Sequence, residues 1–343
     1  MDISSLVRPV LTCTLAAALL GGCSGGGYKG SSLAGGLTPD AKASSERRAD
    51  VLYRHPPVVL PGSNARDERV GKSFVRDVKA TMPLAYISDV YTISGAVYGF
   101  SLAGVLKIKI TGLSEPQGLF VDKKENLWVA NTAANNIEVF AKGSVRPIAT
   151  YNDPNQAPVD VTMCPNGKIY VSNITTGTIS VYSPGKPNPI GMLSDPNDSK
   201  TYFVTCDAAG NVFSTFLAIS SDGAVDEYRK GAQSGLVTLP IPLEFPGAIK
   251  AYRAGNLLID DQEARTITEY TEAGAPTGNA ISFGSGDVAD FGITRNDRTV
   301  GGADTPNLDG KSWFFPSGAP QQTYNAPFKD PIGFAYDPGP KGI

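Results

Sequence analysis

Two stretches of this chain repeat the same pattern of side chains at a fixed offset. Residues 126–140 read NLWVANTAANNIEVF, and 42 positions later residues 168–182 read KIYVSNITTGTISVY. Apolar, small and polar residues match in kind along both stretches. Self-similarity at a period of about 20 to 50 residues indicates a chain of like units, each of which buries its apolar faces against its neighbours.

Weaker copies of this pattern run from residue 81 to the end of the chain. Each copy has a first strand, a second strand that ends in a polar residue, a third with an aromatic residue near its end, and a fourth apolar stretch. The first strands recur with a mean step of 43 residues, at Pro116, Pro158, near Lys200, Pro246, Val288 and Pro331. Four short strands in each repeat predict the blades of a β-propeller.

The two ends of the repeat region are incomplete and complementary. The first copy begins at residue 83 with its second strand, whereas the last residues contain DPIGFAYDP, which matches the first strand EPQGLFVD at 115–122. We therefore predict an all-β fold for residues 81–343, a six-bladed β-propeller with four antiparallel strands per blade. A C-terminal inner strand completes the N-terminal blade and closes the ring, which leaves only short, protected sheet edges.

The composition fits such a domain and argues against one class of partner. Hydrophobic residues make up 41% of the chain and charged residues 18%, as in a globular protein with a core. The 38 Gly and 26 Pro residues allow frequent turns. Because the net charge is -3 and the pI is near 5.4, no basic field would hold phosphates, and we expect no nucleic-acid partner.

The first 22 residues have the features of a signal peptide. After the single Arg8 comes an apolar run of about eleven residues, VLTCTLAAALL, which is too short to span a bilayer. It ends in Leu20-Gly21-Gly22-Cys23, which resembles the lipobox of bacterial lipoproteins. This resemblance implies that Cys23 carries lipid; the alternative is an ordinary secretory signal with a chance cysteine.

The lipobox resemblance also predicts where the protein is located. We expect a lipid-anchored protein of the bacterial cell envelope, attached to the membrane through its N-terminus, in the periplasm or exposed at the surface. The residue that follows the cysteine, Ser24, implies the outer membrane over the inner one. Residues 23–50 are rich in Gly and Ser and are predicted to form a flexible tether, and residues 51–80 form a pre-domain segment of unassigned structure.

One repeat carries a family resemblance. PQGLFVDKKENLWVANTAANNIEVF, at 116–140, resembles the NHL repeat, and residues 81–338 are similar to NHL-repeat and related six-bladed propellers. This broad group includes the SMP-30/gluconolactonase and virginiamycin B lyase types. The resemblance implies the architecture more strongly than the activity, because propellers host many functions on one scaffold.

The enzymes of this group imply two kinds of chemistry. The lyases use a histidine for proton transfer, but the one histidine of this chain, His55, precedes the propeller. The SMP-30-like lactonases hold a divalent cation through oxygen ligands at the channel mouth, for which Glu115, Asp160 and Asp290 are the candidates here. The triplets that open the first strands differ from the Pro-Asn-Gly or Pro-Asp-Gly of that family, and the three carboxylates can instead be solvated strand ends.

Two further sets of residues recur at the period. Polar residues end most second strands and are predicted to cap the turn into the third strand by bonding backbone amides two residues on: Asp89, Asn131, Asn173, Asp260 and Asp304. Cys164 and Cys206 occupy equivalent positions 42 residues apart in adjacent blades. They can form a disulfide in an oxidising compartment or remain two buried thiols.

We therefore expect a non-enzymatic module that binds an unknown protein or small-molecule ligand and needs no cofactor. The alternative is an SMP-30-like metal-dependent lactonase or related hydrolase with one divalent cation. A purely structural envelope protein is a third hypothesis. The sequence identifies neither the ligand nor the face of the ring that would bind it.

Overall fold

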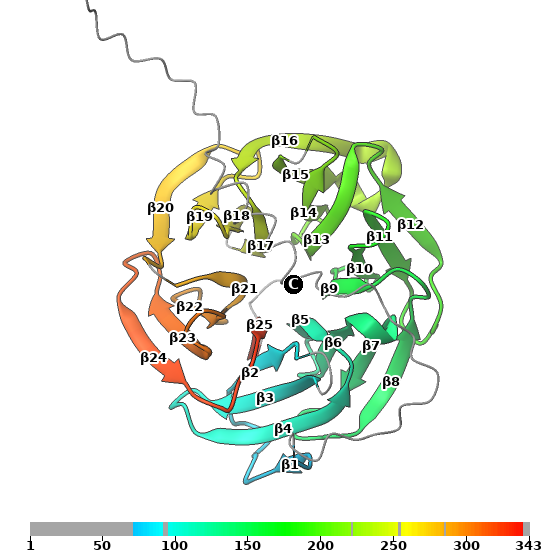
Figure 1. Ribbon diagram of the computed structural model, residues 1–343. Helices are drawn as coiled ribbons and strands as arrows, with labels where there is room; N and C mark the ends of the chain where they lie inside the picture. The colour runs from blue at the N-terminus through cyan, green and yellow to red at the C-terminus, as the bar shows by residue number, and fades with distance from the viewer. Residues whose placement is uncertain (1–70, 92–94, 221, 253–254, 285, 339–343) are drawn as a thin grey trace, which may run out of the picture. The chain divides into compact units, whose positions relative to one another are not determined.

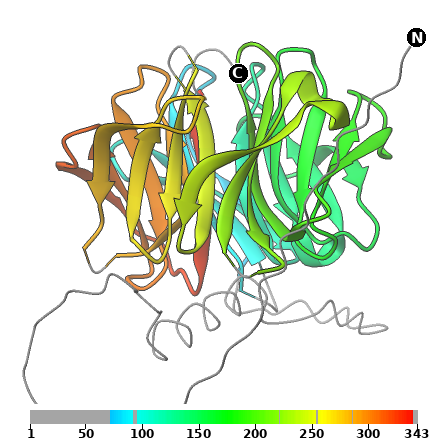
Figure 2. The same ribbon diagram turned by 90° about the horizontal axis from the view of Figure 1, so that it is seen from above.

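The computed structural model describes residues 71–91, 95–220, 222–252, 255–284 and 286–338. These residues belong to one compact unit of the chain, Ala49–Ile343, and form a ring of six β-sheets around a central axis (Figure 1). Figure 2 shows the same sheets from the side. The predicted signal peptide, lipidation site Cys23, tether and His55 lie outside the described residues.

Each sheet is one blade, and we number the blades along the chain. From the innermost strand outward, blade 1 contains β25 (Pro331–Asp337), β2 (Leu84–Asp89), β3 (Gly95–Ser101), β4 (Leu106–Leu113) and β1 (Phe74–Val75). Blade 2 contains β5 (Pro116–Val121), β6 (Leu127–Asn131), β7 (Asn136–Phe140) and β8 (Pro147–Asn152). Blade 3 contains β9 (Pro158–Met163), β10 (Ile169–Asn173), β11 (Thr178–Tyr182) and β12 (Gly191–Ser194).

The second half of the ring follows the same order. Blade 4 contains β13 (Asp198–Cys206), β14 (Val212–Ala218), β15 (Gly223–Tyr228) and β16 (Leu236–Leu243). Blade 5 contains β17 (Pro246–Tyr252), β18 (Asn256–Asp261), β19 (Thr266–Tyr270) and β20 (Pro276–Ser282). Blade 6 contains β21 (Val288–Ile293), β22 (Thr299–Asp304), β23 (Asp309–Phe314) and β24 (Pro320–Tyr324).

The helices in the described part of the chain are three short 3-10 turns. They are η2 (Thr132–Ala134), η3 (Arg229–Gly231) and η4 (Gln233–Gly235). Within the described residues, no helix has the length and apolar character needed to cross a membrane.

The ring closes as the sequence predicts. Strand β25 pairs antiparallel with β2, with Phe334 opposite Ile87 and Ala335 opposite Tyr86. The last strand of the chain is thus the innermost strand of the blade that begins at Leu84 (Figure 1). The prediction of six four-stranded blades closed by a C-terminal inner strand is confirmed.

Blade 1 has one strand that the repeat does not predict. Strand β1 pairs with the outer strand β4, with Phe74 opposite Lys109. The Ser73 hydroxyl accepts a hydrogen bond of 3.0 Å from the Thr111 backbone amide. The end of the pre-domain segment therefore covers the outer edge of blade 1.

The core lies between the blades, because each sheet is covered on both faces by its neighbours. All side chains of β2, β6 and β21 are buried, for example. Between blades 6 and 1 the rings of Tyr324 and Tyr336 lie 5.9 and 5.0 Å from the ring of Phe334. A side chain at Gly301 would collide with both Phe334 and Tyr336, so this close approach requires glycine.

The outer strands differ from the inner ones. Strands β8, β12, β20 and β24 are largely exposed. In β8, β16, β20 and β24 the register with the third strand shifts once along the ladder. The same four strands contain prolines, which have no backbone N–H to donate: Pro147, Pro240, Pro242, Pro276 and Pro320.

Two of the polar residues that end the second strands, Asp89 and Asn131, bond backbone amides of a different loop from the one predicted. The Asp89 carboxylate accepts backbone amides of Lys329 and Asp330, which belong to the connection that enters β25. Asn131 Oδ1 likewise accepts the Ser114 amide, 2.6 Å away, just before β5. These bonds hold the connection from the preceding blade, because that connection passes beside the end of the second strand.

The remaining predicted caps vary from blade to blade. Asn173 bonds the Ser180 hydroxyl, and Asp304 lies 3.5 Å from the Asp287 amide ahead of β21. In blade 5 the amides before β17 are bonded by Asp261, whereas the neighbouring Asp260 is fully buried within the blade. The capping position in blade 5 therefore falls one residue later than the repeat predicts.

Candidate functional site

A pocket of about 460 Å³ lies between blades 2 and 3. Its walls are mostly apolar and include Phe120, Trp128, Val139, Tyr151 and Met163. The pocket opens at the end of the ring that carries the turns between first and second strands, because residues of both such turns line it. Its volume and lining are typical of sites for small molecules.

Two aromatic side chains form the centre of the pocket wall. The rings of Trp128 and Tyr151 lie 5.2 Å apart, and Tyr151 meets Tyr182 edge to face at 5.7 Å. The Tyr151 hydroxyl accepts a hydrogen bond of 3.0 Å from the Gly185 amide. Neighbouring strands hold these rings in place, so the wall is formed before any ligand binds.

The turn between β5 and β6 fixes Trp128 from the other side. Asp122 Oδ1 accepts the backbone amides of Lys124 and Asn126, which is the local bonding that favours Asp at the start of a turn. Asp122 Oδ2 accepts the indole N–H of Trp128 at 3.0 Å. The one carboxylate therefore sets both the turn and the orientation of the indole.

The pocket has positively charged side chains at its rim and a disulfide beside it. Lys123 and Lys124 are exposed on the turn beside the apolar wall. Cys164, which also lines the pocket, forms a disulfide with Cys206, with a Cα–Cα distance of 5.6 Å. The disulfide joins the ends of the inner strands of blades 3 and 4.

A cluster of three charged side chains lies at the axis of the ring. Asp160 on β9 and Asp290 on β21 occupy equivalent positions in opposite blades (Figure 1). Lys250, on β17, places its Nζ 3.7 Å from Asp160 Oδ2 and 3.1 Å from Asp290 Oδ1. The channel thus contains one ammonium between two fully buried carboxylates.

The surroundings of these groups shift their titration. Burial raises the pKa of Asp160 to about 7. The Lys250 ammonium opposes this rise, and the negative charge of Asp290 adds to it. Burial also raises the pKa of Asp290, which Lys250 opposes. Burial lowers the pKa of Lys250, but the two carboxylates raise it by more, so the ammonium is retained at neutral pH.

Both carboxylates also join adjacent blades. Asp160 Oδ2 accepts the Val204 amide on β13, and Asp290 Oδ2 accepts the Phe334 amide on β25, each at 3.2 Å. A side chain at Gly118 would approach Asp160 Oδ1 to 2.5 Å, so blade 2 also packs closely here. These contacts give the two aspartates a structural role in the ring.

The channel beside Lys250 is narrow. The cavity there has a volume of about 40 Å³ and is lined by residues of all six inner strands. A space of this size holds about one water molecule.

The structure does not bring the three predicted metal ligands into one group. Glu115 lies half-buried in the connection before β5, while Asp160 and Asp290 share Lys250. In the described part of the chain, the carboxylates whose spacing suits one cation are a different set, Asp195, Asp198 and Asp226.

Comparisons with known proteins support the fold and leave the function open. The sequence matches no protein-family profile and no curated protein. A chain in a crystal structure of a nidogen/laminin complex is similar with a TM-score of 0.62 and 12% identity, over 74% of this chain and 98% of that one.

Two bacterial proteins are similar at comparable levels. Virginiamycin B lyase from Staphylococcus aureus has a TM-score of 0.52 and 16% identity, over 76% of this chain and 91% of the lyase. Regucalcin from Agrobacterium tumefaciens, a calcium-binding protein, has a TM-score of 0.50 and 13% identity, over 64% of this chain and 77% of that one. At such identities the likeness defines the class alone, a six-bladed β-propeller.

Proposed function

We propose that this protein is a lipid-anchored, extracytoplasmic β-propeller that binds a ligand without catalysing a reaction. The pocket between blades 2 and 3 carries the proposal, because it is preformed, apolar and large enough for a small molecule. The exposed Lys123 and Lys124 at its rim favour a ligand with an apolar body and an anionic group. The anchoring rests on the signal-like N-terminus and on Cys23.

The proposal can be tested with anilinonaphthalene sulfonate, an apolar aromatic anion, and the full-length protein in detergent. We expect saturable binding of one probe, with transfer of excitation energy from Trp128. The variant Trp313→Phe leaves Trp128 as the single tryptophan and should keep this signal. Truncation of the wall in Trp128→Ala, compared with the native protein by probe fluorescence, should weaken binding about tenfold or more.

The charged rim has its own matched comparison. The double variant Lys123→Ala/Lys124→Ala should weaken binding of the anionic probe more at low salt than at high salt. The double variant Lys72→Ala/Lys79→Ala removes two other exposed lysines and should bind normally. Equal binding by Trp128→Ala and the native protein, or no saturable binding, would contradict the pocket as the ligand site.

The competing hydrolase hypothesis has weaker support from the site. A divalent cation between Asp160 and Asp290 would have to displace the Lys250 ammonium, which already lies within 3.7 Å of both. The lyase mechanism has no support either, since the one histidine precedes the propeller and a histidine variant of the S. aureus lyase is described as catalytically inactive.

An assay can decide between binding and hydrolysis. The protein is incubated with simple lactones in the presence of Ca²⁺, Mn²⁺ or Zn²⁺, and ring opening is followed by pH-stat. We expect no turnover above the buffer rate. Metal-dependent turnover that falls in Asp160→Asn would overturn the non-enzymatic proposal in favour of the hydrolase.

A further inference from the structure

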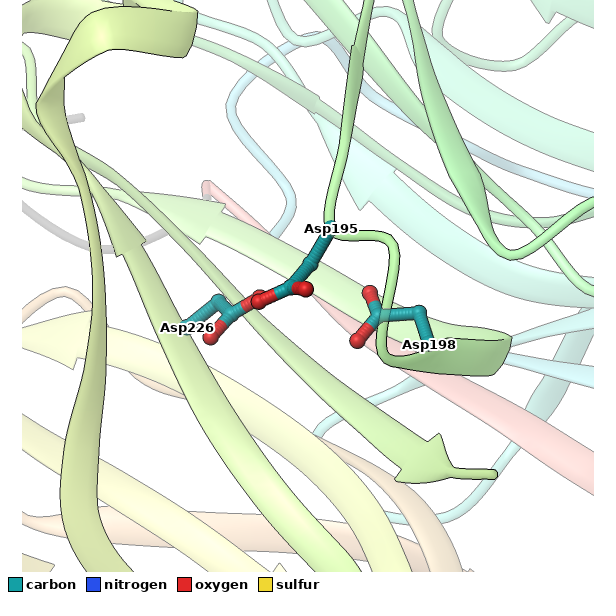
Figure 3. A group of neighbouring side chains, drawn as sticks. All are labelled: Asp195, Asp198 and Asp226. Atoms are coloured by element: carbon teal, nitrogen blue, oxygen red, sulfur yellow. The ribbon is translucent and has the colours of Figure 1, made fainter.

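Three aspartates converge in blade 4, away from the pocket and the channel group (Figure 3). Asp195 lies in the connection between β12 and β13, Asp198 is the first residue of β13, and Asp226 lies on β15. One carboxylate oxygen of each lies within 4.8 Å of those of the other two. Figure 3 shows the Asp195 carboxylate between those of Asp226 and Asp198.

The groups that donate hydrogen bonds to these carboxylates are neutral. Asp195 Oδ1 accepts the Asn197 amide at 2.7 Å, and Asp226 Oδ1 accepts the Thr238 hydroxyl at 2.8 Å. Asp226 is fully buried, yet its Oδ2 has no hydrogen-bond partner among the described residues. A fully buried, unpartnered carboxylate oxygen in a cluster of acids needs a further positive or donating group.

Two more buried oxygens near the cluster are in the same condition. Asp198 Oδ1 has no hydrogen-bond partner within the described chain, and neither has the hydroxyl of Ser214. Ser214 lies directly opposite Asp226 in the β14–β15 ladder, so the two side chains share one face of the sheet. The cluster therefore offers carboxylate and hydroxyl oxygens that have no hydrogen-bond partner among the described residues.

The neighbouring blade shows what the same positions look like without this charge. The two blades share an Asp-Pro-Asn connection and similar third strands, and the equivalent residues are Asp153 and Asp195, Gln156 and Asp198, and Ser180 and Asp226. In blade 3 the Ser180 hydroxyl donates to Asp153 Oδ1 at 2.8 Å. In blade 3 the single carboxylate, Asp153, is therefore hydrogen-bonded to a hydroxyl. Blade 4 has two additional carboxylates, Asp198 and Asp226, at the positions of Gln156 and Ser180.

Blade 6 neutralises its acids in another way. Lys311 occupies the position of Asp226 in the third strand, and its Nζ lies 2.6 Å from Asp304 and 3.5 Å from Asp309. Blades 3 and 6 thus supply a hydroxyl or a lysine at a position where blade 4 has a third acid. Within the described residues, three acids whose carboxylate oxygens lie this close together are found in blade 4 alone.

The spacing of the cluster suits one hard cation. Two oxygens bound to the same Ca²⁺ at about 2.4 Å can lie at most about 4.8 Å apart, and the three carboxylates meet this limit. Mg²⁺ binds oxygens at about 2.0 to 2.1 Å and demands tighter geometry. All the available ligands are oxygens, which excludes a preference for soft metals.

We propose that Asp195, Asp198 and Asp226 bind one Ca²⁺ ion, with the hydroxyls of Ser214 and Thr238 as neighbouring oxygen groups. The ion would tie the connection between blades 3 and 4 to the third strand of blade 4. This ion site is in blade 4, whereas Trp128 of the proposed ligand pocket is in blade 2. The role of the ion is therefore structural and independent of ligand binding.

The test uses the full-length protein in detergent, freed of metal with chelator and titrated with CaCl₂ by calorimetry and thermal unfolding. We expect saturable binding of one Ca²⁺ and a rise in Tm of about 5 °C when Ca²⁺ is at about 100 times its Kd. MgCl₂ should produce a smaller rise at the same concentration.

Variants distinguish this cluster from other acidic residues of the chain. Asp226→Asn keeps the size of the side chain, and Asp226→Ser introduces the residue that blade 3 has, so both should fold. Each should lose about tenfold or more in Ca²⁺ affinity. Asp226→Asn should also raise the Tm without Ca²⁺, because it removes repulsion, and lower the Tm with Ca²⁺.

Asp153, the blade 3 residue equivalent to Asp195, gives the matched control. Asp153→Asn removes a buried carboxylate from the neighbouring connection and should leave the Ca²⁺-dependent rise in Tm intact. No saturable Ca²⁺ binding by the native protein, or unchanged binding in Asp226→Asn, would overturn the proposal.

Discussion

The carboxylate of Asp89 accepts a hydrogen bond of 2.7 Å from the backbone amide of Asp330, 241 residues later in the chain. Together with the β2–β25 ladder, this contact joins the two ends of the propeller. Closing a loop of this length costs conformational entropy, which the packing of the intervening blades must offset.

Removal of this closing contact should destabilise the ring. In Asp89→Ala the amides of Lys329 and Asp330 lose their acceptor, and we expect the free energy of unfolding to fall by about 1–3 kcal/mol in urea titrations. Asp89→Asn keeps an acceptor oxygen and should lose less. Equal losses in the two variants would mean that the hydrogen bonds are not the source of the stability.

The disulfide between Cys164 and Cys206 should stabilise the inner strands of blades 3 and 4. It closes a loop of sequence separation 42, for which the chain-entropy relation gives about 4 kcal/mol. Reductant should therefore lower the Tm of the native protein by about 10 °C in a thermal scan. The double variant Cys164→Ser/Cys206→Ser should show the lower Tm with and without reductant, and a native Tm indifferent to reductant would contradict the prediction.

The channel group makes a prediction about charge balance. Lys250→Met leaves the buried Asp160 and Asp290 without their cation, and unfolding in urea at pH 8 should become easier by about 3–5 kcal/mol. Burial raises the pKa of both aspartates, so the variant gains stability where the carboxyls are protonated. The difference in the free energy of unfolding between the native protein and Lys250→Met should be small near pH 5 and grow as the pH rises through about 7.

A compensated variant provides the control for this prediction. Asp160→Asn/Lys250→Met/Asp290→Asn removes all three charges and should recover most of the loss, with little dependence on pH. A triple variant as unstable as Lys250→Met would show that packing of the lysine side chain, and not its charge, holds the channel.

Glu269 should make blade 5 sensitive to acid. Its carboxylate accepts hydrogen bonds from four side chains, one or two on each of the other strands of the blade: Tyr252, Asn256, Thr277 and Asn279. Burial alone would raise the pKa of Glu269, but these bonds prevail and lower it to about 2.

Because the pKa of Glu269 is lower in the folded protein, its ionised carboxylate stabilises the fold above the ordinary pKa of about 4.5. This stabilisation is lost as the pH falls towards about 2. Glu269→Gln should lose about 2 kcal/mol at pH 7, because an amide group cannot accept from all four donors. The difference between native and variant should shrink below pH 4 in urea titrations. A difference that stays constant from pH 7 to pH 3 would contradict the charge as its origin.

The repeat period was sufficient to predict the ring. Prolines 116, 158, 246 and 331 each begin an inner strand, and Phe334 pairs beside Tyr86 as the incomplete ends require. These features could be predicted because each blade imposes the same alternation of buried side chains. Strand β1 could not, since Phe74 and Val75 lie outside the repeat and pair with only two residues of β4.

The polar sites were less predictable for a physical reason. Lys250 contacts Asp160 and Asp290 across the ring, and no period in the sequence relates a lysine of blade 5 to acids of blades 3 and 6. Asp226 could have been noticed as an acid where blade 3 has Ser180. The loops that Asp89 and Asn131 cap also depend on how successive blades are placed, which local sequence does not specify.

The shifted registers and prolines of the outer strands affect how molecules meet one another. A straight strand edge at the rim would offer a template on which a second ring could extend its own sheet. Pro147, Pro276 and Pro320 begin three of these edges, and no amide is available there to start such a ladder. We therefore expect that rings crowded together stay separate at their circumference and do not join edge to edge.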